Sequence, residues 1–135
     1  MEFLKSMLVA ASGLRAQSER MRLIAENIAN AQSYGHSAGA DPEFRRQIPI
    51  FTREVDRALG LDTVKLTRVV HGETGTRFMP GHPAANEKGE VKTPGVETLT
   101  EMMDLREAQR SYEANINVID NARAIAQRTI DLLRA

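Results

Sequence analysis

The chain has 135 residues, in which 18 basic side chains balance 18 acidic ones. This length predicts one domain, or one domain with an extension, and the balanced charge argues against nucleic-acid or membrane-surface binding and favours protein partners. The absence of cysteine excludes disulfides and thiolate metal sites. No apolar run reaches the roughly 18 residues of a membrane span. The chain is poor in aromatic residues, which favours close helix packing through Ala and Met.

The first predicted element is a helix over residues 3–31, about 43 Å long. Its apolar residues recur at alternating steps of three and four, the pattern of a helix that packs along another helix. We name this set the N-terminal stripe: Leu4, Met7, Ala11, Leu14, Ser18, Met21, Ala25 and Ile28. Gly13 falls mid-helix at a cost of about 1 kcal/mol relative to Ala, so it marks either a close helix crossing or a tolerated interruption.

The middle of the chain predicts a loop followed by short strands. Residues 32–44 are loop-like in composition, and residues 45–92 contain alternating apolar positions around Ile48–Ile50, Val64–Val70 and, more weakly, Arg77–Met79. Pro49 favours an edge strand, and Gly72–Gly75 predicts a hairpin turn. The sequence therefore predicts a small β-rich module.

Two parts of this module are candidates for outer contacts with protein partners. Arg45 and Arg46 form the only basic doublet beside an edge strand, which exposes charge and unpaired backbone together. The turn formed by Pro80, Gly81, His82 and Pro83 is pre-ordered by its prolines, which lowers the entropy lost on docking. The alternative is that Arg45 and Arg46 only keep the strand edge soluble.

The last predicted element is a helix over residues 98–133, about 54 Å long. Thr98 and Glu101 have the spacing of a capping box at its start. A strict heptad set, the first C-terminal stripe, comprises Met102, Leu105, Gln109, Tyr112, Ile116, Ile119, Arg123, Ala126, Ile130 and Leu133. A second C-terminal stripe, about 110° away, comprises Val118, Ala122, Ile125, Thr129 and Leu132. Two stripes predict packing partners on two sides; the alternative is an ordinary long helix in one monomeric core.

Polar residues within these helices are candidates for fixing the register of packed helices. Gln109 and Arg123 occupy core-type positions, where polar groups commonly select register and partner. Asn27, Asn30 and Asn115 are unusual in helices, and lateral hydrogen bonds between packed helices would account for them. The alternative is that the stripes partly face solvent.

The sequence predicts neither a metal site nor a catalytic centre. His36, His71 and His82 are scattered without the spacing of a metal site. Residues 72–77 lack the ending and the following helix of a phosphate loop, and no nucleophile is framed by a base. We therefore expect no enzymatic activity, no cofactor and no small-molecule substrate.

The expected architecture is mainly α with a small β-rich middle. Long N- and C-terminal helices would form a coiled-coil-like core layer, with the β segment inserted between them. The corresponding divisions are 1–34 for the N-terminal helix, 35–96 for the loop and β-rich module, and 97–135 for the C-terminal helix.

Several motifs resemble bacterial flagellar rod and hook proteins, the flagellar axial family. The N-terminal motifs are Ala11-Ser-Gly-Leu-Arg-Ala-Gln17 and Ile24-Ala-Glu-Asn-Ile-Ala-Asn30. The C-terminal motifs are Glu101-Met-Met-Asp104 and Arg110-Ser-Tyr-Glu-Ala-Asn115. Phe44-Arg-Arg-Gln47, Pro80-Gly-His-Pro83 and Thr93-Pro94 resemble the proximal rod members of that family.

The resemblance implies a structural subunit of the basal-body rod, the tubular drive shaft that carries torque across the periplasm. Its partners would be other copies of itself, the rod proteins FlgB, FlgF and FlgG, the rod-base adaptor FliE, and the flagellar type III export apparatus. The N-terminal stretch does not resemble a Sec signal, so export without a cleaved signal is expected. The alternatives are another axial subunit, FlgB-like or from the distal rod, and, less favoured, a coiled-coil adaptor, a secretion chaperone or an enzyme.

Overall fold

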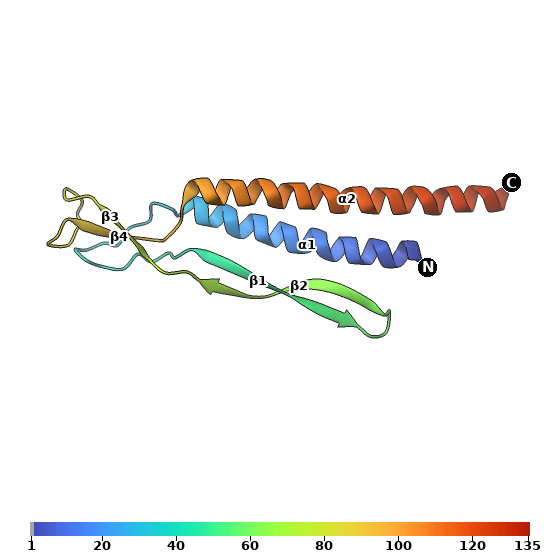
Figure 1. The fold of residues 1–135 in the computed structure, drawn as a ribbon, viewed down its shortest axis with the longest axis horizontal. Coiled ribbons are helices and arrows are strands. Elements are labelled where there is room, and N and C mark those ends of the chain that lie inside the picture. The colour runs from blue at the N-terminus through green and yellow to red at the C-terminus, as the bar shows by residue number, and fades with distance from the viewer. Residues whose placement is uncertain (1) are drawn as a thin grey trace.

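The computed structural model describes residues 2–135 as two long helices and two small antiparallel hairpins (Figure 1). The helices are α1 (Glu2–Ala29) and α2 (Thr98–Arg134). The strands are β1 (Gln47–Asp56), β2 (Leu61–His71), β3 (Gly75–Phe78) and β4 (Glu90–Thr93). This architecture confirms the predicted fold class, mainly α with a small β-rich middle.

Three elements lie side by side along the length of the molecule. Figure 1 shows α2 antiparallel to α1, and the β1–β2 hairpin running along the other side of α1. The β3–β4 hairpin and the loop after α1 lie beyond the helix pair, at the end where α2 begins. The element that has partners on two sides within one chain is therefore α1, whereas the sequence predicted this for the C-terminal helix.

The helix ends lie within two residues of their predicted positions. α1 ends at Ala29: the amide of Ala31 donates to the Ile28 carbonyl three residues back at 3.3 Å, and Asn30 Nδ2 donates to the Glu26 carbonyl at 2.8 Å. α2 begins at Thr98, but the predicted capping box is wrong. Glu97 occupies the N-cap position with no side-chain cap, and the Glu101 carboxylate points to Arg46 instead.

The β-rich middle consists of two separate hairpins. β1 pairs with β2, with Ile48 opposite Val70 and a bulge between Ile50 and Phe51. Asp56 Oδ1 accepts from the amides of Ala58 and Leu59 in the connecting turn. The prediction of a hairpin turn at residues 72–75 is wrong, because β2 and β3 belong to different sheets. β3 pairs with β4, which the sequence analysis did not identify as a strand.

The buried core is thin and is built mainly from small side chains. In the helices it contains Ala10, Ala16, Leu23, Ile24, Ala108 and Ala122. Small residues allow two helix backbones to approach closely, and they bury little apolar area. Most of the larger apolar side chains of α2 consequently remain at the surface.

Candidate assembly surface

A buried polar junction joins the start of α2 to the end of α1 and the start of β1. Asn27 Nδ2 donates to the Gln47 carbonyl at 2.9 Å, and the Gln47 amide donates back to Asn27 Oδ1 at 2.8 Å. Asn27 Nδ2 also lies 3.4 Å from Glu101 Oε2. Asn27 and Glu101 are each only 1% exposed. Because their polar atoms are paired, this junction sets the register of α1 against both α2 and β1.

Arg46 completes the junction. Its Nε donates to Glu101 Oε1, and its Nη2 lies 3.9 Å from Asp104 Oδ2. Its backbone N donates to the Pro94 carbonyl at 3.0 Å, and its carbonyl accepts from Gly72 at 2.8 Å. The Arg46 side chain is therefore an internal ion-pair partner, a role that its interpretation as an outer contact did not include; it remains 34% exposed. Arg45, the other half of the doublet, is exposed.

The line of α2 that faces α1 is small and polar rather than apolar. Glu101 and Ala108 are buried, Asn115 is half-buried and Ala122 is buried, each seven residues after the last. A Cβ on Gly13 would meet the Asn115 side chain at 2.9 Å. Gly13 therefore marks a close approach of the two helices, the first of the two explanations that the sequence left open.

The two C-terminal stripes lie on either side of this contact line. With a heptad repeat, Leu105, Tyr112, Ile119 and Ala126 are turned roughly 50° to one side of it, and Val118, Ile125 and Leu132 roughly 50° to the other. The first group is half-buried, and the second is exposed. Farther round, five more positions of the first stripe are exposed: Met102, Gln109, Ile116, Arg123 and Ile130; Leu133, seven residues after Ala126, is exposed as well. Both flanks of α2 thus keep uncovered apolar side chains.

The N-terminal stripe lies on the side of α1 that α2 does not cover. Its members divide evenly: Met7, Leu14, Met21 and Ile28 are half-buried, whereas Leu4, Ala11, Ser18 and Ala25 are exposed. The half-buried set comes one residue after the contact positions Gly13 and Asn27, so it is turned roughly 100° from α2. The residues buried in α1 lie outside the eight positions of the stripe: Ala10, Ala16, Leu23, Ile24 and Asn27.

The half-buried half of the N-terminal stripe and the exposed positions of the first C-terminal stripe share one face of the helix pair. In a pair of antiparallel helices, the residue that follows a contact position points to the same side of the pair in both helices. Met7, Leu14, Met21 and Ile28 therefore lie on the same side as Met102, Ile116 and Ile130. On the opposite side, Val9, Val118 and Leu61 line one shallow cavity beneath the β1–β2 turn. We call the first side the open face, since no other element covers it (Figure 1).

The predicted register residues divide into two groups. Asn27 and Asn115 lie in the α1–α2 contact, and Asn30 caps the last turn of α1. Gln109 and Arg123 are exposed on the open-face side of α2. The sequence analysis did not assign Glu101 to the contact. The set Glu101, Ala108, Asn115 and Ala122 recurs every seven residues, a spacing that could have identified it.

The Pro80–Pro83 turn lies at the β3–β4 end of the molecule. Pro80, Gly81 and Pro83 are exposed, which leaves them free for outer contacts. His82 is half-buried: its ring lies edge-on to Tyr34 with centroids 5.0 Å apart, and its Nδ1 accepts from the Ala84 amide at 3.0 Å. His82 thus holds the turn to the loop after α1.

Within residues 2–135, no group of His, Cys, Asp or Glu is arranged to hold a metal ion. In the same range, no helix is both long and apolar enough to cross a membrane. The arrangement that the structure does offer is a rigid helix pair with an uncovered apolar face.

Comparison with known proteins identifies the family. Residues 87–132 match a family described as flagellar basal body rod FlgEFG protein C-terminal. The chain is 47% identical to a flagellar basal-body rod protein FlgC of Agrobacterium fabrum, over 94% of this chain and 92% of the relative. A FlgC of Salmonella typhimurium is 36% identical over 92% of both chains, and one of Aquifex aeolicus is 31% identical over 97% of both. The chain therefore belongs to the FlgC family of flagellar basal-body rod proteins.

Proposed function

We propose that this chain is a structural subunit of the flagellar rod that packs through its two terminal helices against neighbouring subunits. Self-assembly would build the tubular drive shaft that transmits torque across the periplasm. The role is mechanical, and we assign no catalytic step to it. The relatives' description as basal-body rod proteins supports this function.

The observation that carries the proposal is the open face. Apolar side chains from both helices lie on one side of the pair with nothing over them; Met102 is 56% exposed and Ile130 is 46% exposed. An uncovered apolar surface that extends along two helices marks an interaction site. The heptad repeat of this surface favours further helices as its partners, since such a repeat keeps apolar residues in contact along the whole length of a packed helix.

The partners that we propose are other copies of this chain and other rod components. Among the latter are FlgB, FlgF and FlgG, together with the rod-base adaptor FliE. The exposed Arg45 precedes β1 and the Pro80–Pro83 turn connects β3 to β4, so both lie outside the two helices and are available for contacts outside the helical layer.

We further propose that the chain reaches the basal body through the flagellar type III export apparatus with its N-terminal stretch retained. Ala10 is 4% exposed in the interior. Removal of the stretch before Ala11 would therefore delete part of the packed core. Mass spectrometry of purified basal bodies tests this proposal, and a chain that begins near Ala11 or Ser12 would contradict it.

The test of the structural role is a charge placed on the open face. Ile116 is 37% exposed, so Ile116→Asp should change the free energy of unfolding by less than about 1 kcal/mol. In an assembled rod, the same carboxylate would be buried without a partner at a cost of several kcal/mol. We expect a folded chain that is absent from purified basal bodies, and cells that do not swim.

Asn117→Asp is the matched control, because it introduces the same charge at the next residue, roughly 100° farther round the helix. Asn117 is exposed. This variant should be incorporated into basal bodies normally. Normal incorporation of Ile116→Asp would show that the open face is not an assembly surface, and absence of the unmodified chain from basal bodies would refute the rod assignment itself.

A further inference from the structure

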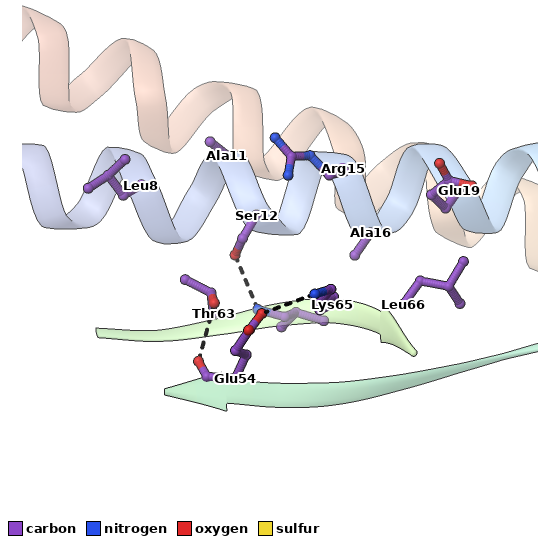
Figure 2. A pocket seen from close by; sticks show the side chains of 11 residues that line it. Leu8, Ala11, Ser12, Arg15, Ala16, Glu19, Glu54, Thr63, Lys65 and Leu66 are labelled. Carbon is purple, nitrogen blue, oxygen red and sulfur yellow. Dashed lines mark hydrogen bonds and ion pairs between the residues drawn. The ribbon is translucent and has the colours of Figure 1, made fainter. Parts of the chain in front are cut away.

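A groove runs between α1 and β2 on the side of α1 away from the open face. Its volume is about 540 Å³, and Figure 2 shows the side chains that line it. Its apolar lining comes from Leu8, Ala11, Ala16, Val64 and Leu66. A single hydrogen bond is recorded across it among residues 2–135, from the Val64 amide to Ser12 Oγ at 3.3 Å. The groove is thus a largely apolar space with little polar contact between its two walls. We call it the hairpin groove.

The hairpin groove has a charged rim of both signs. Glu54 Oε2 lies 4.0 Å from Lys65 Nζ on the strand side. On the helix side, Arg15 is exposed and makes no ion pair within residues 2–135. Glu19 also belongs to this side and is paired with Arg22. A ligand of this groove therefore needs an apolar centre and charged flanks of both signs.

The C-terminal end of α2 has those properties and is itself uncovered. The contacts of Asn27 with Glu101 and of Gly13 with Asn115 place Glu2 opposite residue 126. Residues 128–134, which we call the α2 tip, consequently extend about 10 Å past the described part of α1 (Figure 1). Ile130, Leu132 and Leu133 in this tip are 46%, 78% and 82% exposed.

We propose that the α2 tip of one copy binds in the hairpin groove of a second copy. This inference rests on the proposed rod function and names one pair of surfaces that would mate within it. The tip is about 10 Å long, and the stretch of β2 from Thr63 to Leu66 that lines the groove is also about 10 Å long. The apolar tip residues would fill the groove, and the charged ones would lie at its rim.

Charge complementarity favours the tip over an uncharged helix as the occupant. The tip carries Arg128 and Arg134, which would lie near Glu54 and Glu19 at the rim. Asp131 is exposed, and within residues 2–135 its side chain has one hydrogen-bond partner, Nε2 of Gln127, which donates to its Oδ1 at 3.0 Å. It would face the unpaired Arg15. Each sign on the tip thus has its opposite on the rim.

The contact cannot form within one chain. Ala11 lies opposite residue 117, and Leu133 is about 24 Å farther along α2. Because the tip and the hairpin groove are different surfaces, contact between copies is head-to-tail. Such contacts produce an open helical polymer whenever the rotation between neighbours does not close a ring. The proposed contact therefore generates the type of symmetry that a rod requires.

Cysteine cross-linking in purified basal bodies tests the proposal, since the chain has no native cysteine to interfere. The Ala11→Cys, Leu133→Cys chain should form a ladder of covalent dimers and higher multimers of itself under mild oxidation. The control is Phe78→Cys with Leu133→Cys; Phe78 is 70% exposed and belongs to β3, which lies at the end of the molecule opposite to the C-terminus (Figure 1). The control should give no ladder.

Incorporated chains that carry the Ala11 and Leu133 cysteines but form no ladder would overturn the proposal and leave the rod function intact. A cross-link to a different rod subunit would overturn the choice of a second copy as the occupant. Failure of even the unmodified chain to enter basal bodies would instead refute the rod function.

A charge exchange gives a second test that does not depend on cysteine geometry. Arg15→Asp and Asp131→Arg alone should each reduce rod incorporation severalfold, because each places like charges together. The two changes combined should restore incorporation, since the opposite charges then face each other again. Absence of restoration, with both single variants defective, would refute the Arg15–Asp131 contact.

Discussion

Removal of the Arg46 guanidinium should destabilise the chain far more than removal of its neighbour. Glu101 is 1% exposed, and Arg46 Nε is its cationic donor. Arg46→Ala would leave the carboxylate buried with only the 3.4 Å contact to Asn27 Nδ2. Breaking one side of a buried pair costs about 3–5 kcal/mol. Since the Arg46 side chain is itself 34% exposed, water can partly replace it, and we expect about 3 kcal/mol.

Urea unfolding followed by circular dichroism measures this cost. With an m value of about 1.5 kcal/mol per molar urea, a loss of about 3 kcal/mol lowers the midpoint by about 2 M. Arg45→Ala is the matched control, since Arg45 is exposed, and its effect should stay within about 0.5 kcal/mol. Equal midpoints for the two variants would refute the reasoning.

Replacing both partners separates the ion pair from the rest of the junction. Arg46→Met with Glu101→Leu removes the buried charge together with its partner, so the double variant should be more stable than Arg46→Ala alone. Hydrogen exchange at the Gln47 amide, which donates to Asn27 Oδ1, reports whether the junction remains closed. A double variant less stable than Arg46→Ala would show that the contact depends on the charges themselves.

Three further outcomes follow from the helix pair. Gly13→Ala should lower the free energy of unfolding by about 1 kcal/mol, because overpacking against Asn115 outweighs the gain in helix propensity. In urea unfolding, adding Asn115→Ala should relieve this loss. A raised urea midpoint for Gly13→Ala alone would refute the reasoning. Ile125 is 46% exposed on the other flank of α2, so the Ile125→Asp variant should fold normally but abolish motility. Normal swimming of cells with this variant would show that this flank faces solvent in the rod. In the isolated chain, amides of residues 128–134 should exchange faster than the Gln47 amide, and slow exchange throughout the tip would contradict its exposure.

The extents of both helices could be predicted from the sequence, but their mutual contact could not. Heptad spacing of apolar residues located α1 and α2 to within two residues at each end. The contact itself uses Glu101, Ala108, Asn115 and Ala122, a small and polar line that hydrophobic periodicity does not detect. An apolar stripe does not show whether its surface is for contact within the same chain or for contact with another molecule. The stripes therefore identified the uncovered flanks more readily than the internal contact.

The β-rich middle was predicted as strands without their pairing. Alternation around Ile48 and Val64 indicated β1 and β2, but nothing local in the sequence specified that they pair with each other. Arg46 was assigned to the surface because it forms, with Arg45, a basic doublet beside an expected edge strand. Its partner Glu101 is 55 residues away in the chain, and such a distant ion pair leaves no local signal.

The long separation in sequence between α1 and α2 has a consequence for the order of folding. Asn27 and Glu101 are 74 residues apart, and closing a flexible loop of that length costs roughly 4 kcal/mol in chain entropy. Until residues near Glu101 become available, α1 lacks the surface that buries Ala10 and Ile24, and an amphipathic helix takes most of its stability from such packing. A chain threaded through a narrow passage from either end presents one of these helices without the other. Under the export route proposed above, the molecule would complete its helical layer only after nearly all of it had emerged.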